Sequence, residues 1–547
     1  MQMTSFSTGK PDLFVRKSSG FVREASAFDA IVFNAVFSAP VGAVLAWGVF
    51  FSLSAFPGAN IVAAILISFV LNIPIIIMMS SLASSMPRTG GDYVWVSRIL
   101  SPAMATISSF AAAFSALIGA TFWARYFPVY ALGPALVTFG AMFNNNSMIT
   151  WGNNFQSNNT WIFLGSFLMI ILMTLLLVAG TKRTLKWMNV SWIIASIGTF
   201  IAFIALALGS KAKFMEHFNT LSAKYGTTGD AYHKVIAGGG AVAKTSSSLT
   251  NWNATFPTIF VIMTFMMWNW WSVYLSGELK GASSKSRHEK IMYSSLTWNV
   301  VFLIMGILLL YRIVGHDFMS AANTSGNKAY VLPSGPWYQF LSSVTLNIPV
   351  LTFLIVGSFL FWCLPAMVGN VYQPVRAVFA WSFDRLLPEK LANINPKTHS
   401  PVPAIMTVMG LVTVMLVWSV NATTFATWLA LGVLAGVVCI IIVAIAAFTF
   451  PSRRKDLYDN SPANVKFMGI PVLKIVSPLS ALVMIFLVWA VLKYPALAIG
   501  TPANAWWVPA FIGGIVVVGL LLYYIPKAVR KSQGIDIDLV YKELPPE

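Results

Sequence analysis

The sequence predicts an all-α polytopic membrane protein, because it is poor in charge and contains long uncharged runs. Of the 547 residues, 57% are hydrophobic and only 10% are charged, whereas an ordinary soluble domain carries about 25% charged residues. Residues 30–87 contain no Asp, Glu, Lys, Arg or His, and one bilayer crossing takes about 20 apolar residues. Because lipid cannot hydrogen-bond an exposed backbone, each crossing must be a helix. Soluble enzymes, nucleic-acid-binding proteins and fibrous proteins are thereby excluded.

Apolar runs of sufficient length predict twelve transmembrane helices. The third run continues past Pro128 and Pro134 to Phe143, as in a long tilted helix with a kinked extension. The twelve predicted spans are residues 29–53, 59–85, 102–127, 161–180, 187–209, 256–276, 291–314, 347–371, 402–420, 425–450, 473–492 and 505–525.

The connections between the spans are expected to be loops, with no soluble domain among them. Residues 210–255 are the longest connection, and glycines 238–240 and serines 246–248 within it are typical of a flexible linker. Residues 315–346 and 451–472 are expected to be loops as well. Any function must then lie in the helical bundle and its short connections.

Basic residues are distributed unevenly between the two sides of the predicted bundle. With the N-terminal tail placed inside, 26 Lys and Arg fall on the inner side and six on the outer side. Positive residues concentrate on the cytoplasmic side of membrane proteins, so the net charge of +18 reflects orientation rather than nucleic-acid binding. We therefore expect cytoplasmic tails at residues 1–28 and 526–547, and a multi-pass location in the plasma membrane.

The ionisable residues argue against an enzyme. All five histidines are predicted in loops or tails, and Asp29 and Glu278 are the acidic residues near a span. Intramembrane hydrolysis, metal chemistry and proton relays need such groups to converge at depth. We expect no catalytic residue, no bound metal and no cofactor. Cys363 and Cys439 both lie within apolar spans, so no disulfide framework is expected either.

Passage of a small solute remains, and such solutes bind where helices are interrupted near the bilayer midplane. The first span contains Pro40, which lacks an N–H, and Gly42, which tolerates unusual backbone angles. An ordinary kink and a binding site explain this pattern equally well. Under the second interpretation the candidate substrate contacts are Asn34, Phe37, Ser38, Ala39, Pro40, Val41 and Gly42.

The sixth span carries a polar residue among aromatic ones. Asn269 follows Trp268 and precedes two further tryptophans, well inside the span rather than at its end, which favours a pocket wall over an interfacial aromatic belt. Phe265, Trp268 and Asn269 are the candidate substrate contacts here, although no Gly or Pro marks unwinding at this cluster and Gly277 is the first to follow it. Ser115 of the third span is a further candidate, but it belongs to a small-residue surface for which helix packing is the simpler explanation.

Three groups of motifs in the predicted inner loops carry a family resemblance. Residues 87–93 (Pro-Arg-Thr-Gly-Gly-Asp-Tyr) follow the second span, and residues 277–280 (Gly-Glu-Leu-Lys) follow the sixth. After the eighth span come residues 376–380 (Arg-Ala-Val-Phe-Ala), 384–388 (Asp-Arg-Leu-Leu-Pro) and 400–403 (Ser-Pro-Val-Pro). In this order and among twelve spans, the motifs resemble those of the amino acid–polyamine–organocation (APC) transporter superfamily, of the amino acid permease type.

The resemblance covers residues 27–450 and implies the architecture of that superfamily. A ten-helix core at residues 29–450 would form a five-plus-five inverted repeat, its halves at residues 29–209 and 256–450, and residues 473–525 would add two helices. In this fold the substrate lies between spans 1, 3, 6, 8 and 10. Members of the family are secondary transporters, which mostly carry amino acids and related amines by alternating access.

The resemblance also bears on the site residues and on coupling. It places Asn370 of the eighth span near the pocket wall, and it aligns the family's Gly-Ser-Gly motif with residues 37–39 (Phe-Ser-Ala), so both glycines are absent. Sodium sites in this fold use hydroxyl groups of the eighth span, yet residues 359–381 contain no Ser or Thr. Residues 187–209 contain no Lys of the kind that some proton-coupled relatives use. We therefore expect exchange with a counter-substrate, or coupling to a proton through an unidentified group.

The charge of the predicted pocket indicates the class of substrate. Its segments contain no carboxylate that could pair with a cationic side chain, and an unpaired charge at depth is costly. Neutral apolar or aromatic amino acids therefore suit the Trp and Phe lining best. Two alternatives stay open, namely another small organic solute such as an amine, polyamine or nucleobase, and a non-transporting amino-acid sensor with the same fold. The partners expected are a small-molecule substrate and the lipid bilayer, and no nucleic acid.

Overall fold

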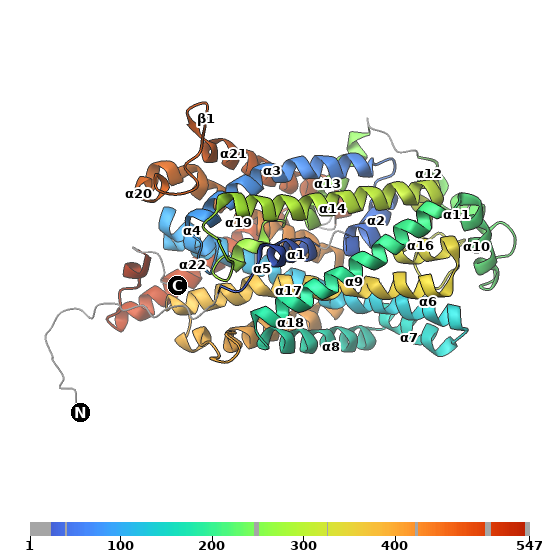
Figure 1. The fold of residues 1–547 in the computed structure, drawn as a ribbon, viewed down its shortest axis with the longest axis horizontal. Coiled ribbons are helices and arrows are strands. Elements are labelled where there is room, and N and C mark those ends of the chain that lie inside the picture. Colours follow the sequence, from blue (N-terminus) through green and yellow to red (C-terminus); the bar gives the residue numbers. More distant parts are fainter. Residues whose placement is uncertain are drawn as a thin grey trace.

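The structure is a computed structural model that describes residues 23–38, 41–245, 251–324, 326–421, 425–497 and 505–541. These residues form a bundle of long helices with one short antiparallel hairpin (Figure 1). Twelve of its helical stretches are long and apolar enough to cross a membrane, and they coincide with the twelve predicted spans. The prediction of an all-α polytopic membrane protein is confirmed.

The spans are numbered here in chain order, and three of them contain more than one labelled element. Polar side chains cap several of them: Asn60 Oδ1 accepts the Ala63 N–H at 2.8 Å, and Ser101 Oγ accepts the Met104 N–H at 3.3 Å. Spans 1 to 6 are α1 (Ala27–Ser38) with η1 (Val41–Gly48) and α2 (Val49–Ala55), α3 (Ile61–Ser85), α5 (Pro102–Tyr126) with η2 (Phe127–Leu132) and α6 (Gly133–Phe143), α8 (Asn159–Val178), α9 (Thr181–Leu208), and α13 (Trp252–Met266) with η3 (Trp271–Leu275). Spans 7 to 12 are α14 (Lys285–Ile313), α17 (Pro349–Phe383), α18 (Val402–Asn421), α19 (Phe425–Arg453), α21 (Val472–Lys493) and α22 (Trp507–Ser532).

Span 3 runs without interruption from Pro102 to Phe143. Its middle element, η2, is a π-helical turn that contains Pro128. Proline removes one backbone N–H from the helix ladder, and a π-turn is one of the recognised ways in which a helix absorbs such a defect. The α-helix resumes at Gly133 with Pro134 in its first turn, where a missing N–H is tolerated. The expected extension of the third span to Phe143 is confirmed.

The prediction that the longer connections are loops was wrong. Residues 210–255 contain α10 (Lys211–Ala223), α11 (Ala231–Gly238) and α12 (Gly240–Lys244), and residues 315–346 contain α15 (His316–Ala322) and α16 (Tyr338–Leu346). Residues 451–472 contain α20 (Lys455–Tyr458) and the hairpin of β1 (Lys466–Phe467) and β2 (Ile470–Pro471).

Short amphipathic helices explain this error. They lack the long apolar run by which spans are recognised, yet they bury one face: Phe214, Tyr232 and Phe318, from three of the elements, pack their rings together. Glycines 238–240 end α11 and begin α12 instead of forming a linker. Serines 246–248 lie outside the described residues.

The two ends of the bundle carry different elements. Figure 1 shows α4 (Asp92–Ile99), α20 and β1 at one end of the long axis, and α7 (Asn146–Ser157), α10, α11 and α12 at the other. The elements α4, α20 and β1 belong to the predicted inner connections, which together with the tails hold most of the Lys and Arg residues. We call this end of the bundle the basic end.

Part of each predicted tail is described, namely residues 23–28 and 526–541, and the Ala25 N–H of the first donates to the Glu278 carbonyl at 2.9 Å. The segment assigned to the C-terminal tail begins inside α22, which continues to Ser532. It then docks through η7 (Ile537–Tyr541), where the Tyr541 hydroxyl lies 2.9 Å from that of Tyr93 on α4. Residues 1–22 and 542–547 lie outside the described residues.

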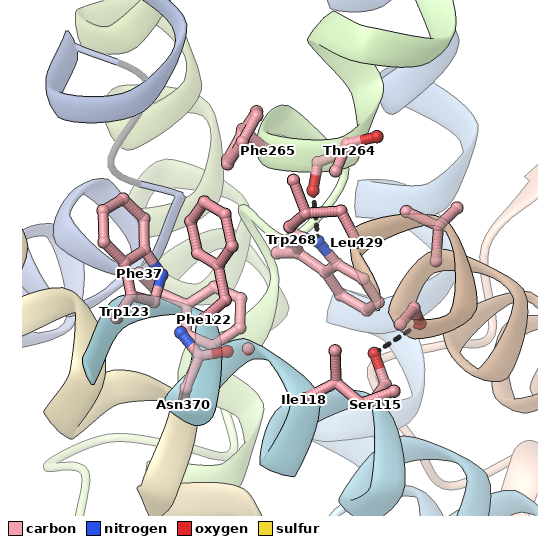
Figure 2. A pocket seen from close by; sticks show the side chains of 13 residues that line it. Phe37, Ser115, Ile118, Phe122, Trp123, Thr264, Phe265, Trp268, Asn370 and Leu429 are labelled. Carbon is pink, nitrogen blue, oxygen red and sulfur yellow. Dashed lines mark hydrogen bonds between the residues drawn. The ribbon is translucent and has the colours of Figure 1, made fainter. Parts of the chain in front are cut away.

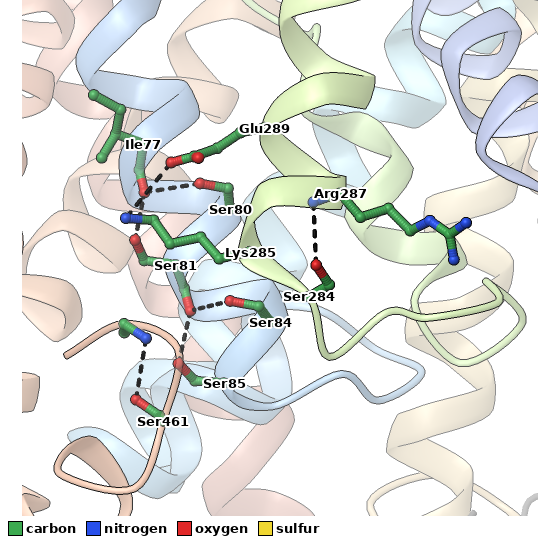
Figure 3. A network of polar contacts seen from close by, with 11 residues as sticks. Ile77, Ser80, Ser81, Ser84, Ser85, Ser284, Lys285, Arg287, Glu289 and Ser461 are labelled. Atoms are coloured by element: carbon green, nitrogen blue, oxygen red, sulfur yellow. Dashed lines mark hydrogen bonds and ion pairs between the residues drawn. The ribbon is translucent and has the colours of Figure 1, made fainter. Parts of the chain in front are cut away.

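Spans 2 and 7 pack together near the basic end (Figure 3). On α3, Ser80 and Ser81 donate to the Ile77 carbonyl, so these small polar side chains are satisfied within their own helix. On α14, Lys285 pairs with Glu289 at 3.5 Å. The polar side chains between these two spans thus find their hydrogen-bond or ion-pair partners within the protein and need none from lipid.

A buried ion pair joins the end of span 6 to span 8. Glu278 follows η3, Arg376 lies on α17, and both side chains are almost fully buried and in direct contact. The Tyr372 hydroxyl donates to Glu278 Oε2 at 3.1 Å and accepts from Arg376 Nη2 at 2.9 Å. Removing one partner of such a pair is far more costly than the net worth of the pair, because the remaining charge stays buried.

We expect Glu278→Gln to destabilise the protein by roughly 3–5 kcal/mol, because it removes the carboxylate that balances the buried guanidinium of Arg376. The measurement is the melting temperature of the detergent-solubilised protein. Asp456→Asn is the matched control: it breaks the exposed pair with Arg454 (2.8 Å) and is expected to leave the melting temperature unchanged. Equal melting temperatures for wild type and Glu278→Gln would contradict a role of the pair in holding spans 6 and 8.

Candidate functional site

The helix of span 6 is interrupted in the interior of the bundle. Helix α13 ends at Met266, residues 267–270 form turns, and the chain resumes as the 3-10 helix η3. The Trp268 indole N–H donates to the Thr264 carbonyl at 2.8 Å, and the Asn269 side-chain amide donates to the Met266 carbonyl at 2.5 Å. Two carbonyls at the end of α13 are therefore satisfied by side chains, which matters because an unsatisfied group in a bilayer costs several kcal/mol.

Side chains and backbone groups of neighbouring spans bind the residues that follow Trp268 in the break. Asn34 of span 1 accepts the Ser272 N–H at 2.7 Å and donates to the Ser272 hydroxyl at 3.0 Å. Asn299 of span 7 donates to Asn269 Oδ1 at 3.2 Å, and the Trp271 indole donates to the Gly369 carbonyl of span 8 at 3.2 Å. The conformation of the break is thus fixed from three sides.

Span 1 also changes its helical form near its centre. Helix α1 ends at Ser38 and the chain continues as the π-helix η1 from Val41. The Gly42 carbonyl accepts the Tyr126 hydroxyl at 2.9 Å, and a Cβ atom at Gly42 would lie only 2.6 Å from Trp362 Cβ. Glycine is therefore the residue that lets spans 1 and 8 approach so closely.

A cavity lies between spans 1, 3, 6, 8 and 10, next to the break in span 6 (Figure 2). Its empty volume is about 450 Å³, counted with its opening. Phe37 forms part of the wall, and its ring stacks on Trp271 at 4.6 Å and meets Trp268 edge to face at 6.1 Å. The lining residues are Phe37, Ser115, Ile118, Gly119, Phe122, Trp123, Thr264, Phe265, Trp268, Asn370, Leu429, Gly432 and Val433.

Some of the predicted substrate contacts line the cavity, and others hold the helices around it in place. Asn34 and Asn269 hold the break in span 6, as described above, and Gly42 packs against span 8. Ser38 is buried at the end of α1. Ala39, Pro40 and the side chain of Val41 lie outside the described residues. The predicted residues that line the cavity are Phe37, Ser115, Phe265, Trp268 and Asn370.

Several lining residues were not identified from the sequence. Phe122 and Trp123 continue the helical face of Ser115 and Gly119 on span 3, so the spacing along that helix was the signal that could have found them. Gly432 lies on span 10, where its carbonyl accepts the Ser115 hydroxyl at 2.7 Å. A Cβ atom at Gly436, one turn further, would lie 2.2 Å from the Trp268 ring. Small residues of span 10 thus make room for the aromatic wall.

A second, smaller cavity shares a wall with the first. Thr264, Phe265 and Leu429 line both, while Trp47 and Phe51 of span 1 line only the second. The Thr264 hydroxyl donates to the Phe260 carbonyl of its own helix at 2.9 Å, so the shared wall is mainly apolar. The two cavities therefore adjoin beside span 6.

The histidines of the chain lie away from the central cavity. Four histidines predicted in loops lie in helices, namely His217, His233, His288 and His316, and the ring Nε2 of the buried His288 lies 2.8 Å from the Ala282 carbonyl. Within the described part of the chain, no three His, Cys, Asp or Glu side chains converge as metal ligands would. No charged residue is among those that line the central cavity.

Comparison with family models assigns the chain. The model described as amino acid permease matches residues 30–523, which include all twelve spans apart from short pieces of the first and the last. The chain belongs to the amino acid permease family. This agrees with the APC resemblance of the loop motifs, and it makes the permease a multi-pass membrane transporter of amino acids or related solutes. A search of curated protein sequences returns no significant match.

Gly119 provides a test of the central cavity. A Cβ atom there would lie 2.0 Å from Asn370 Oδ1, so we expect Gly119→Ala to displace the Asn370 amide and weaken substrate binding at least tenfold, about 1.4 kcal/mol. Binding is measured by titrating the purified permease with the amino acid that raises its melting temperature most. Gly410→Ala on span 9, where nothing lies within 4 Å of the added atom, is the control. Wild-type affinity in both variants would exclude this cavity as the binding site.

Proposed function

We propose that the permease is a secondary transporter of neutral apolar or aromatic amino acids in the plasma membrane. The observation that carries this proposal is the wall of the central cavity, which consists of aromatic, aliphatic and small uncharged residues from five spans. A cationic side chain entering this cavity would lose its hydration without gaining a carboxylate partner, which is costly at such depth. An apolar side chain would instead gain from leaving water.

The charged groups of the amino acid itself need polar partners, and the breaks in spans 1 and 6 supply peptide groups. In the interrupted part of span 6, the carbonyls of Phe265 and Met267 accept no hydrogen bond from any described residue. We propose that the substrate ammonium group binds carbonyls of this segment, and that its carboxylate binds N–H groups at the start of η1 in span 1. Peptide dipoles are suited to this because they bind a zwitterion without a buried ion.

Alternating access is proposed from the arrangement of the two cavities. Phe265 and Leu429 stand between the central cavity and the second cavity next to Trp47 and Phe51. The second cavity lies toward the end of the bundle opposite the basic end, because it includes Ala496 and Leu497, which follow α21. Movement of the wall around Phe265 would open the central cavity toward the end of the bundle opposite the basic end. Tilting of the two halves of the proposed five-plus-five repeat against each other would open it toward the basic end.

Orientation and coupling complete the proposal. The excess of Lys and Arg at the basic end supports a cytoplasmic location of that end and of both termini. In span 8, residues 359–381 contain no Ser or Thr that could supply hydroxyl ligands for sodium. We therefore propose exchange, or coupling to a proton.

Counterflow in liposomes tests the substrate class. Liposomes that contain the purified permease and unlabelled leucine or phenylalanine are expected to accumulate the labelled amino acid, whereas arginine and putrescine are expected to give less than a tenth of that uptake. Protein-free liposomes and the Gly119→Ala variant are the controls. Counterflow of arginine, a polyamine or a nucleobase without leucine or phenylalanine would overturn the proposed substrate class. Binding of amino acids without counterflow would instead indicate a sensor.

A further inference from the structure

A buried carboxylate lies at the basic end where three spans meet. Asp92 begins α4, between spans 2 and 3, and is fully buried. Its Oδ2 accepts the Ser108 hydroxyl of span 3 at 2.6 Å, and its Oδ1 accepts the Tyr274 hydroxyl of span 6 at 2.8 Å. The Cys439 Sγ of span 10 lies 3.4 Å from Ser108 Oγ, so span 10 reaches the same point as spans 3 and 6.

The backbone before Asp92 is shaped to permit this contact. Gly90 and Gly91 have φ angles of +107° and +51°, which side chains disfavour. A Cβ atom at Gly91 would lie 2.8 Å from the Tyr274 ring, so only glycine allows the turn to pass beside that ring. The two glycines of the motif therefore place the Asp92 carboxylate directly against Tyr274.

No cation compensates the charge of Asp92 in the described part of the chain. The titratable groups that face it are Tyr274 from η3 and Cys439 from α19, while α5 contributes the hydroxyl of Ser108. Arg98, on α4 itself, and Asp384 act instead on the neighbouring Tyr93. Arg454 also contacts α4, through a hydrogen bond from its guanidinium to the Arg98 carbonyl at 3.0 Å.

Protonation of Asp92 falls in the range of ordinary solution pH. Burial raises the pKa of its carboxyl to about 6, and the hydrogen bonds from Ser108, Tyr274 and Cys439 only partly oppose this rise. The carboxyl group is therefore expected to be ionised above pH 6 and neutral below it.

The position of Tyr274 links this carboxyl group to the substrate site. Tyr274 lies on η3, the short helix that begins immediately after the break in span 6. When Asp92 is ionised, it accepts two charge-assisted hydrogen bonds, which tie η3 to span 3 across α4. Protonation converts these into neutral hydrogen bonds of about half the strength. Loss of a proton thus strengthens the contact between spans 3 and 6, and gain of a proton weakens it.

We propose that Asp92 is a proton-binding site of the permease, and that its protonation releases the half of span 6 beyond the break so that the transport cycle runs faster. This inference rests on the proposed transport function. It assigns the ligand, a proton, to a site outside the substrate cavity, and it gives Asp92 a positioning role that acts through Tyr274. The site lies at the basic end, so the proton exchanges with the solution on that side.

Exchange of leucine or phenylalanine, measured at equal pH on both sides of the membrane from pH 5 to 8, tests this proposal. Wild-type exchange is expected to rise at least threefold as the pH falls through about 6. Asp92→Asn, which resembles the protonated acid and cannot ionise, is expected to exchange at the acid rate throughout. Tyr274→Phe removes a donor to the ionised form, so the midpoint is expected to move to higher pH. Asp384→Asn, which removes the carboxylate next to Tyr93, is the control and should keep the wild-type midpoint.

A flat wild-type profile, or an Asp92→Asn profile with the wild-type midpoint, would overturn the proposal. If the wild type exchanges no amino acid at any pH, the proposed transport function fails, and the proton site is then judged from stability. Because the pKa of Asp92 is raised on folding, its ionisation destabilises the native state as the pH rises from about 4 to about 6. The melting temperature of Asp92→Asn should therefore exceed that of wild type by more at pH 7 than at pH 4, and a constant difference would count against the proton site.

Discussion

The hydrogen bonds that Asn34 makes to Ser272 are the interaction on which the rest of the structure depends. They connect span 1 to the second half of span 6 at the point where the backbone of span 6 leaves its helix. In lipid an interrupted helix persists only if other protein groups replace the lost backbone bonds. Asn34, Asn269 and Trp268 do this with their side chains, so the break is a fixed feature of the bundle. The central cavity exists because span 6 does not fill the space beside it.

The aromatic wall and the small residues opposite it follow from the same constraint. A large ring at Trp268 can stand beside the break only because span 10 has glycine at Gly436, and Asn370 reaches the cavity only because span 3 has glycine at Gly119. Charge is kept away from this region. The buried pair of Glu278 and Arg376 lies after span 6, toward the basic end, and Asp92 lies beside η3, where it contacts Tyr274. The site therefore combines an uncharged cavity with ionisable groups arranged around the end of the same half-helix.

Much of the fold could be predicted from the sequence, because lipid imposes one simple requirement on every span. The twelve apolar runs and the extension of span 3 through Pro128 follow from it. Helix α10 carries no such run and was missed. The site was harder to predict, since a sequence gives the position of a side chain along a helix but not its partner. Asn34 and Asn269 remain predicted substrate contacts, and the sequence did not indicate that Asn34 would bond to Ser272 or Asn269 to the Met266 carbonyl. Five predicted residues do line the cavity, namely Phe37, Ser115, Phe265, Trp268 and Asn370.

A cryo-electron microscopy map of the permease with bound phenylalanine would test the central claim most directly. We expect density for the amino acid in the central cavity, against the wall that Phe37 and Trp268 form, with its ammonium group within hydrogen-bonding distance of carbonyls in residues 265–269. We also expect span 6 to be interrupted after Met266. A continuous helix through this part of span 6, or phenylalanine bound elsewhere with this cavity filled by side chains, would contradict the account.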